Sequence, residues 1–130
     1  MSREQWFGGA TLVLAAIAIG GGFWLLGSPR YQRKVARDNQ LAASLQNVEA
    51  RISIEYRKQQ KLPGRIDEFK NPITDKPFEY QRLDESRYQL CADFETDSFK
   101  DPSVYSYSRE SFERHSAGHY CQTINLGLER

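Results

Sequence analysis

The feature that most constrains this chain is an uncharged apolar run over residues 6–26, WFGGATLVLAAIAIGGGFWLL. At about 1.5 Å per residue, a helix of this length spans roughly 30 Å, the thickness of the hydrocarbon core of a bilayer. Aromatic residues lie at both ends, at Trp6, Phe7, Phe23 and Trp24, where a membrane helix meets the two interfaces. The sequence therefore predicts an N-terminal tail over residues 1–5 and a transmembrane helix over residues 6–27.

A cleaved signal peptide is the alternative interpretation of this run, since Ala16 and Ala18 supply the small residues of a cleavage site. The apolar sequence continues to Leu26, however, and exceeds the core of about 7–15 residues that is typical of signal peptides. We therefore favour a retained anchor.

Small residues four positions apart, Ala16 with Gly20 and Ala18 with Gly22, favour close approach of a second helix in the membrane. A flexible stretch at the three consecutive glycines is the alternative. The expected partners are membrane lipid and either another membrane protein or a second copy of the chain.

Residues 28–130 are hydrophilic and long enough for one small domain. They carry 17 Lys and Arg against 16 Asp and Glu, and this balance speaks against a nucleic-acid partner. The charge is uneven, with eight basic and three acidic residues in 28–61, and two basic and six acidic residues in 84–101. Solvent-exposed surfaces explain both segments. The alternative is that the basic segment contacts anionic lipid and the acidic segment contacts a cation or a basic partner.

The patterning of this domain predicts an α+β fold. Residues 28–60 form a long amphipathic helix that Ser28 caps and Pro29 opens, residues 61–77 form connecting turns, and residues 78–126 form an antiparallel β-meander. A long loop over 95–118 interrupts the meander, with a short helix expected near residues 109–114. Apolar residues at steps of three and four give the long helix one stripe to cover the sheet: Val35, Leu41, Ala42, Leu45, Val48, Ile52 and Tyr56.

Alternation assigns the faces of the two longer strands. In residues 88–94, Tyr88, Leu90, Ala92 and Phe94 share one face, which places Cys91 on the other. In the last strand, Cys121 likewise points to the face opposite to that of Tyr120. Two cysteines on neighbouring antiparallel strands can form a disulfide, which would stabilise the domain by roughly 3–4 kcal/mol; two reduced core thiols are the alternative.

Several motifs of this chain carry a family resemblance. The segment NPITDKPFEY over residues 71–80, followed by the YQL of residues 88–90, resembles the sheet entry of type II secretion pseudopilins and type IV pilins. The chain is also similar to a family of small bacterial single-pass membrane proteins that share GSP, LP, YxLCAxF and HxAGxxC motifs. These motifs stand here at residues 27–29, 62–63, 88–94 and 115–121. The resemblance implies a pseudopilin-like domain over residues 28–130 and no particular activity.

The resemblance does not extend to pilin processing, because no Glu follows Gly8, Gly9 and Ala10 within the apolar run. Basic residues after the anchor would favour a cytoplasmic domain. The cysteine pair and the pseudopilin resemblance favour export. We therefore expect a bacterial inner (cytoplasmic) membrane protein whose domain is extracytoplasmic.

Two metal sites are alternatives to a chain without cofactors. Cys91, His115, His119 and Cys121 are ligand types that suit zinc, but their spacing matches no common zinc pattern. Asp93, Glu95, Asp97 and Asp101 form an acidic run that suits calcium, as in some pseudopilins, without EF-hand spacing. Because the sequence holds no nucleophile elbow or phosphate loop, we expect a non-enzymatic interaction module, with a metal-dependent sensor domain as the alternative.

Overall fold

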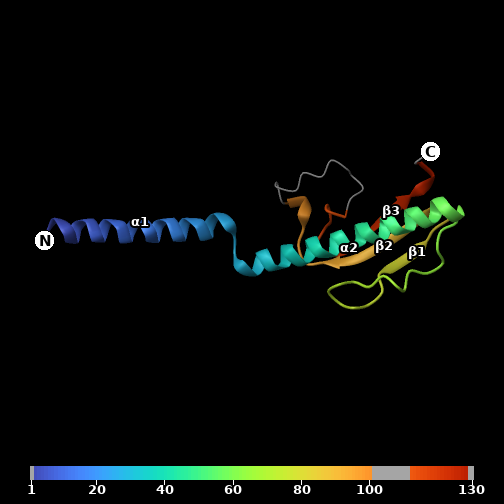
Figure 1. Cartoon of the computed structure of the whole chain (residues 1–130), viewed down its shortest axis with the longest axis horizontal. Helices are drawn as coiled ribbons and strands as arrows, with labels where there is room; N and C mark the ends of the chain where they lie inside the picture. The colour runs from blue at the N-terminus through green and yellow to red at the C-terminus, as the bar shows by residue number, and fades with distance from the viewer. Residues whose placement is uncertain (1, 101–111, 129–130) are drawn as a thin grey trace. The chain divides into compact units, whose positions relative to one another are not determined.

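The computed structural model describes residues 2–100 and 112–128 of the chain (Figure 1). The chain divides into two units, residues 1–33 and 34–130. Its elements, in chain order, are the helices α1 (Arg3–Leu26) and α2 (Pro29–Gln59), the strands β1 (Glu79–Arg82) and β2 (Arg87–Phe94), the short 3-10 helix η1 (Ser98–Lys100), the strand β3 (Gly118–Asn125) and the 3-10 helix η2 (Leu126–Leu128). The α+β class predicted from the sequence is confirmed.

Helix α1 is long and apolar enough to cross a membrane. It runs over Arg3–Leu26, so residues 3–5 of the predicted N-terminal tail are helical. The Ser2 backbone N–H donates to the Gln5 side chain, and this bond caps the N-terminus of α1. Glu4 in the first turn also suits the positive end of the helix dipole.

The break between the two helices lies where the sequence predicts it. Gly27 has φ of 73°, a conformation that side chains other than glycine rarely adopt. The Ser28 hydroxyl then accepts the Tyr31 N–H at 3.3 Å, and Pro29 is the first residue of α2, where its missing N–H leaves no bond unmade. Gly27 therefore ends one helix, and Ser28 with Pro29 begins the next.

The apolar stripe of α2 forms one side of the core. Leu41, Ala42, Leu45, Val48 and Ile52 are buried, as predicted. Tyr56 packs against the same cluster from the end of the helix.

The three strands form one antiparallel sheet in the order β1-β2-β3, and α2 runs along one face of it (Figure 1). The register places Tyr88 opposite Ile124 and Leu90 opposite Gln122, with these side chains on the face that α2 covers. Burial of this inner face against the helix stripe supplies most of the core. The core cluster from the sheet and its flanks comprises Phe78, Tyr88, Leu90, Ala92, Phe94, Phe112, Ile124 and Leu126.

The connecting segment closes one edge of this core. Leu62 and Ile66 are buried in it. The Tyr80 hydroxyl donates to the Pro63 carbonyl at 2.8 Å and ties the segment to β1. Asn71 accepts a backbone N–H two residues on, the expected role of Asn in a turn.

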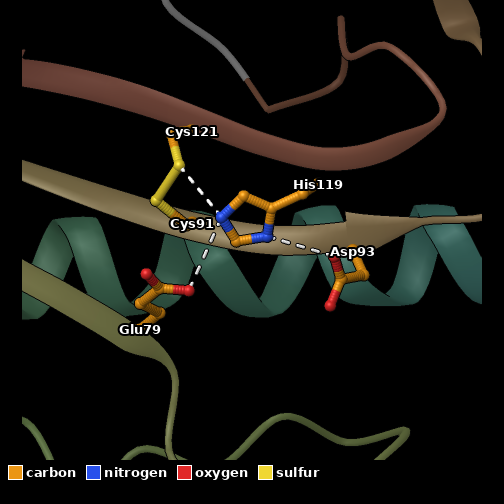
Figure 2. Close-up of a disulfide and its surroundings, with 5 residues drawn as sticks. All are labelled: Glu79, Cys91, Asp93, His119 and Cys121. Carbon is orange, nitrogen blue, oxygen red and sulfur yellow. Dashed lines mark hydrogen bonds and ion pairs between the residues drawn. A yellow bond between two sulfur atoms is a disulfide. The ribbon is translucent and has the colours of Figure 1, made fainter.

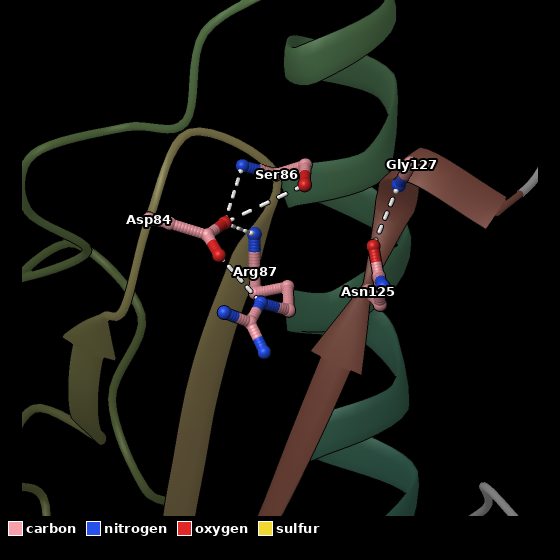
Figure 3. A network of polar contacts seen from close by, with 5 residues as sticks. All are labelled: Asp84, Ser86, Arg87, Asn125 and Gly127. Atoms are coloured by element: carbon pink, nitrogen blue, oxygen red, sulfur yellow. Dashed lines mark hydrogen bonds and ion pairs between the residues drawn. The ribbon is translucent and has the colours of Figure 1, made fainter.

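The turn between β1 and β2 is held by one carboxylate (Figure 3). Asp84 accepts the backbone N–H groups of Ser86 and Arg87 at 2.9 and 2.7 Å, and the Arg87 guanidinium donates to its second oxygen. The Ser86 N–H and the Arg87 side chain lower the pKa of Asp84 to about 2. A similar local bond, from the Gly127 N–H to the Asn125 side chain at 2.9 Å, marks the end of β3.

The predicted loop 95–118 contains η1 and a turn at Phe112, whose side chain is fully buried. Residues 109–111 of the short helix predicted near 109–114 lie outside the described residues; residues 112–114 form a turn. The ends of the loop are joined where Ser98 and His115 exchange backbone and side-chain hydrogen bonds.

Candidate functional site

The disulfide predicted from the sequence is present on the sheet face that points away from α2. Cys91 in β2 and Cys121 in β3 are direct partners in the antiparallel register, with their Cα atoms 4.1 Å apart. The sulfur atoms are bonded to each other. Cys91 is 6% exposed and Cys121 is half-buried, so the bond is reachable from one side.

A polar cluster surrounds this disulfide on the same face (Figure 2). His119 Nε2 lies 3.4 Å from Cys121 Sγ and 3.6 Å from a Glu79 carboxylate oxygen. His119 Nδ1 lies 3.1 Å from an Asp93 oxygen. A carboxylate only accepts hydrogen bonds, so the Asp93 contact requires the form of the His119 ring that carries a proton on Nδ1. Nε2 faces the Cys121 sulfur and the Glu79 carboxylate.

The strand registers explain why these residues meet. Glu79 is opposite Cys91, and Asp93 is opposite His119, so all three strands contribute to one patch. Because side chains two apart on a strand share a face, His119 and Cys121 point the same way, as do Cys91 and Asp93. Alternation along the sequence assigns the cysteines to this face, but it does not predict that Glu79 joins them.

A cavity of about 430 Å³ adjoins the cluster. Its walls come from residues 37–41 of α2, the segment over residues 71–79, the second half of β2 and the start of β3. His119, Glu79 and Asp93 contribute to the lining, together with the basic residues Arg37 and Lys76. The cavity therefore gives solvent and small ions access to the histidine.

His115 lies apart from this patch, on the inner side of the sheet. It is 2% exposed and stacks on Phe94 with ring centroids 3.7 Å apart. Burial lowers its pKa, and the nearby Asp38 carboxylate opposes this shift only in part. Of the four residues of the predicted zinc set, Cys91, His119 and Cys121 are therefore brought together and His115 is not, because His115 belongs to the core.

The three described residues of the predicted calcium set each have a different partner. Asp93 pairs with His119, Glu95 lies 3.7 Å from Arg37, and Asp97 lies 3.5 Å from Lys100. Asp101 lies outside the described residues. Across residues 2–100 and 112–128, the His, Cys, Asp and Glu residues form a metal-sized group of three or more only at Cys91, His119 and Cys121.

Asp38 is a site residue that the sequence-based predictions missed. It is 3% exposed, and its carboxylate accepts the backbone N–H groups of Glu95 and Thr96 at 2.9 and 2.7 Å, together with the Thr96 hydroxyl. It thereby fastens the end of β2 to α2. A signal was available: Asp38 is three residues before Leu41, on the buried stripe, where an unpartnered carboxylate would be costly.

In the first unit, the large apolar side chains of α1 over residues 6–25 are exposed, with Trp24 at 92% and Leu12 at 73%. At Gly20 and Gly22, the glycines of the predicted packing faces, a methyl group in place of hydrogen would meet no other atom within 4 Å. Ala16 and Ala18 lie on the same exposed helix. These residues are therefore open to lipid or to another helix.

Comparison of this chain with known protein families, curated proteins and solved structures finds no match.

Proposed function

We propose that this protein is a membrane-anchored, non-enzymatic interaction module of the bacterial envelope. In this proposal α1 lies in the inner membrane and the domain of residues 34–130 is extracytoplasmic. The domain contacts other subunits of a membrane complex, of the secretion type or as an accessory part of another assembly.

The observation that carries the proposal is the exposed apolar surface of α1, which holds no charged residue after Gln5. A helix that presents Trp24, Leu12 and Ile17 to its surroundings is stable only in lipid or against other apolar helices. The Cys91–Cys121 disulfide supports the extracytoplasmic side, since such bonds persist in oxidising compartments. The order of long helix and antiparallel meander agrees with the pseudopilin resemblance of the motifs.

The anchor is tested by fractionation of cells and extraction of membranes with alkaline carbonate. Leu14→Arg with Ile17→Arg should release the chain from membranes, because each central arginine costs about 2.5–3.5 kcal/mol on insertion. Ile54→Arg, at an exposed position of α2, is the matched control and should stay in the membrane fraction. Release of the unmodified chain by carbonate would refute the anchor.

The interaction role is tested by the native size of the particle extracted in mild detergent. We expect an assembly larger than one chain, which Gly20→Leu with Gly22→Leu should reduce if α1 contributes a contact. Gly8→Leu is the control near the other end of the same helix. A strictly monomeric particle with no co-purifying subunit would count against the interaction module.

A further inference from the structure

The outer face of the sheet holds a set of metal-binding atoms that the disulfide keeps from acting as ligands. Cys91, Cys121 and His119 present three ligand atoms that all lie within 4.8 Å of one another. Glu79 places a carboxylate 3.6 Å from the same histidine nitrogen (Figure 2). Thiolate, imidazole and carboxylate are the three ligand types of protein zinc sites.

We propose that reduction of the disulfide converts this face into a Zn²⁺ site. The sulfurs of Cys91 and Cys121 and Nε2 of His119 are three of its ligands. Glu79 supplies the fourth. The proposal goes beyond the interaction role and does not depend on it.

The distances already present favour this assignment. With bonds of about 2.0–2.3 Å to zinc, the ligand atoms of a tetrahedral site lie about 3.3–3.8 Å apart. His119 Nε2 stands at 3.4 Å from Cys121 Sγ and 3.6 Å from Glu79, so two of the six separations are already met. The two sulfurs come from directly opposed strand positions, and only side-chain rotation is needed for them to separate after reduction.

Asp93 completes the arrangement as a positioning residue. Zinc-binding histidines commonly donate their second ring N–H to a carboxylate, which fixes the tautomer and the ring orientation. The Asp93 oxygen lies 3.1 Å from His119 Nδ1 and leaves Nε2 for the metal. This outer carboxylate is opposite His119 in the register, so the backbone itself sets the contact.

The conversion balances as a thiol–disulfide exchange followed by metal binding. A dithiol reductant gives two electrons and two protons, its own sulfurs join in a disulfide, and Cys91 and Cys121 become thiols. Zn²⁺ then displaces the two thiol protons to solvent as the thiolates bind. Exchange with an oxidised dithiol runs the same step backwards: its disulfide takes the two electrons, with two protons from solvent, the Cys91–Cys121 bond re-forms, and Zn²⁺ is released.

The half-exposed His119 and the adjoining cavity provide a route for the ion, since its side chain is 52% accessible. The site prefers zinc to calcium because calcium takes oxygen ligands, and two of the four atoms here are sulfur.

The test uses the full chain purified in detergent, with Co²⁺ as the spectroscopic probe and Zn²⁺ as its competitor. After reduction with a phosphine and removal of oxygen, we expect one Co²⁺ per chain with tetrahedral d–d bands and a thiolate-to-cobalt charge-transfer band. Zn²⁺ should abolish both signals. The oxidised chain should show neither.

Variants that keep both cysteines separate the ligands from the rest of the surface. His119→Ala should remove the tetrahedral spectrum of the reduced chain, and Asp93→Asn should weaken Zn²⁺ binding by about 10–100-fold. Glu79→Gln should also weaken it, whereas Glu68→Gln, an exposed carboxylate elsewhere in the domain, should have no effect.

The proposal is overturned if reduced and oxidised chains bind Zn²⁺ equally, if no thiolate band forms, or if His119→Ala binds as Glu68→Gln does. If reduction unfolds the domain, Zn²⁺ should restore its circular dichroism spectrum, because metal binding then supplies folding free energy. Failure to refold with Zn²⁺ would equally overturn it. None of these outcomes bears on membrane anchoring or on the size of the extracted particle.

Discussion

The two faces of β2 differ although their residues alternate along the same eight-residue strand. Leu90 and Phe94 point inward and are buried against α2, at 0% and 4% exposure. Cys91 and Asp93 point outward and contact Cys121 and His119. The inner face thus stabilises the fold, while the outer face gathers reactive groups that the core does not require. Substitutions on one face should leave the properties of the other largely unchanged.

Among these substitutions, Phe94→Ala on the inner face should lower the free energy of unfolding the most. The side chain packs in the core and stacks on His115, so its removal leaves a cavity and should cost about 3–5 kcal/mol. Asp93→Ala, the neighbour on the outer face, is the control and should change stability by about 0.5 kcal/mol or less. Urea unfolding of both variants measures the difference. Equal losses would mean that the two faces do not act separately.

Cys121→Ser tests the outer face. The side chains of this face should contribute little to the stability of the domain, except for the disulfide. Loss of the disulfide should lower the free energy of unfolding by about 2–5 kcal/mol, since the open chain gains conformational entropy when unfolded.

The same cysteines report the compartment of the domain. Thiol labelling of denatured protein taken directly from cells should detect no free thiol without prior reduction and two after it, as expected for an exported domain. Two free thiols before reduction would contradict the proposed extracytoplasmic side.

Asp38→Ala should have an intermediate effect, because it frees the end of β2 from α2. The backbone N–H groups of Glu95 and Thr96 would lose their acceptor, at a cost of about 1–3 kcal/mol. Asp67→Ala, an exposed carboxylate, is the control. Hydrogen exchange at these two amides should accelerate in the first variant alone; unchanged protection would argue against the proposed fastening.

The smallest expected effect is on the pH dependence of stability, to which His115 on the inner face contributes. Burial lowers its pKa in the folded state, so the unfolded chain binds the proton more readily. The stability that neutral, buried His115 contributes is therefore complete above the ordinary histidine pKa of about 6.5. It is lost as the pH falls below about 6.5 toward the pKa of His115 in the folded protein. His115→Phe should flatten the melting temperature between neutral and mildly acidic pH. An unchanged slope would show that another group titrates there.

Local patterning was sufficient for the elements and for the faces of the strands. The uncharged run over residues 6–26 indicates the helix α1, because an apolar run of this length is typical of a helix that can span a bilayer. Ser28 and Pro29 mark the start of α2 through their preference for the first positions of a helix. Period-two alternation placed Leu90 inward and Cys91 outward. The disulfide followed from the same alternation together with the expected pairing of β2 and β3.

The tertiary structure alone decided which polar residues meet. His115 and His119 are four positions apart in sequence, yet one stacks in the core and the other faces the disulfide, because β3 begins between them. Pairing Glu79 with Cys91 depends on the β1–β2 register, and pairing Asp38 with Thr96 depends on how α2 packs across the sheet. The sequence by itself determined the apolar helix α1, the buried stripe of α2 and the strand faces, which depend on near neighbours. Contacts between distant residues depend on register and packing, and these are fixed only when the whole domain folds.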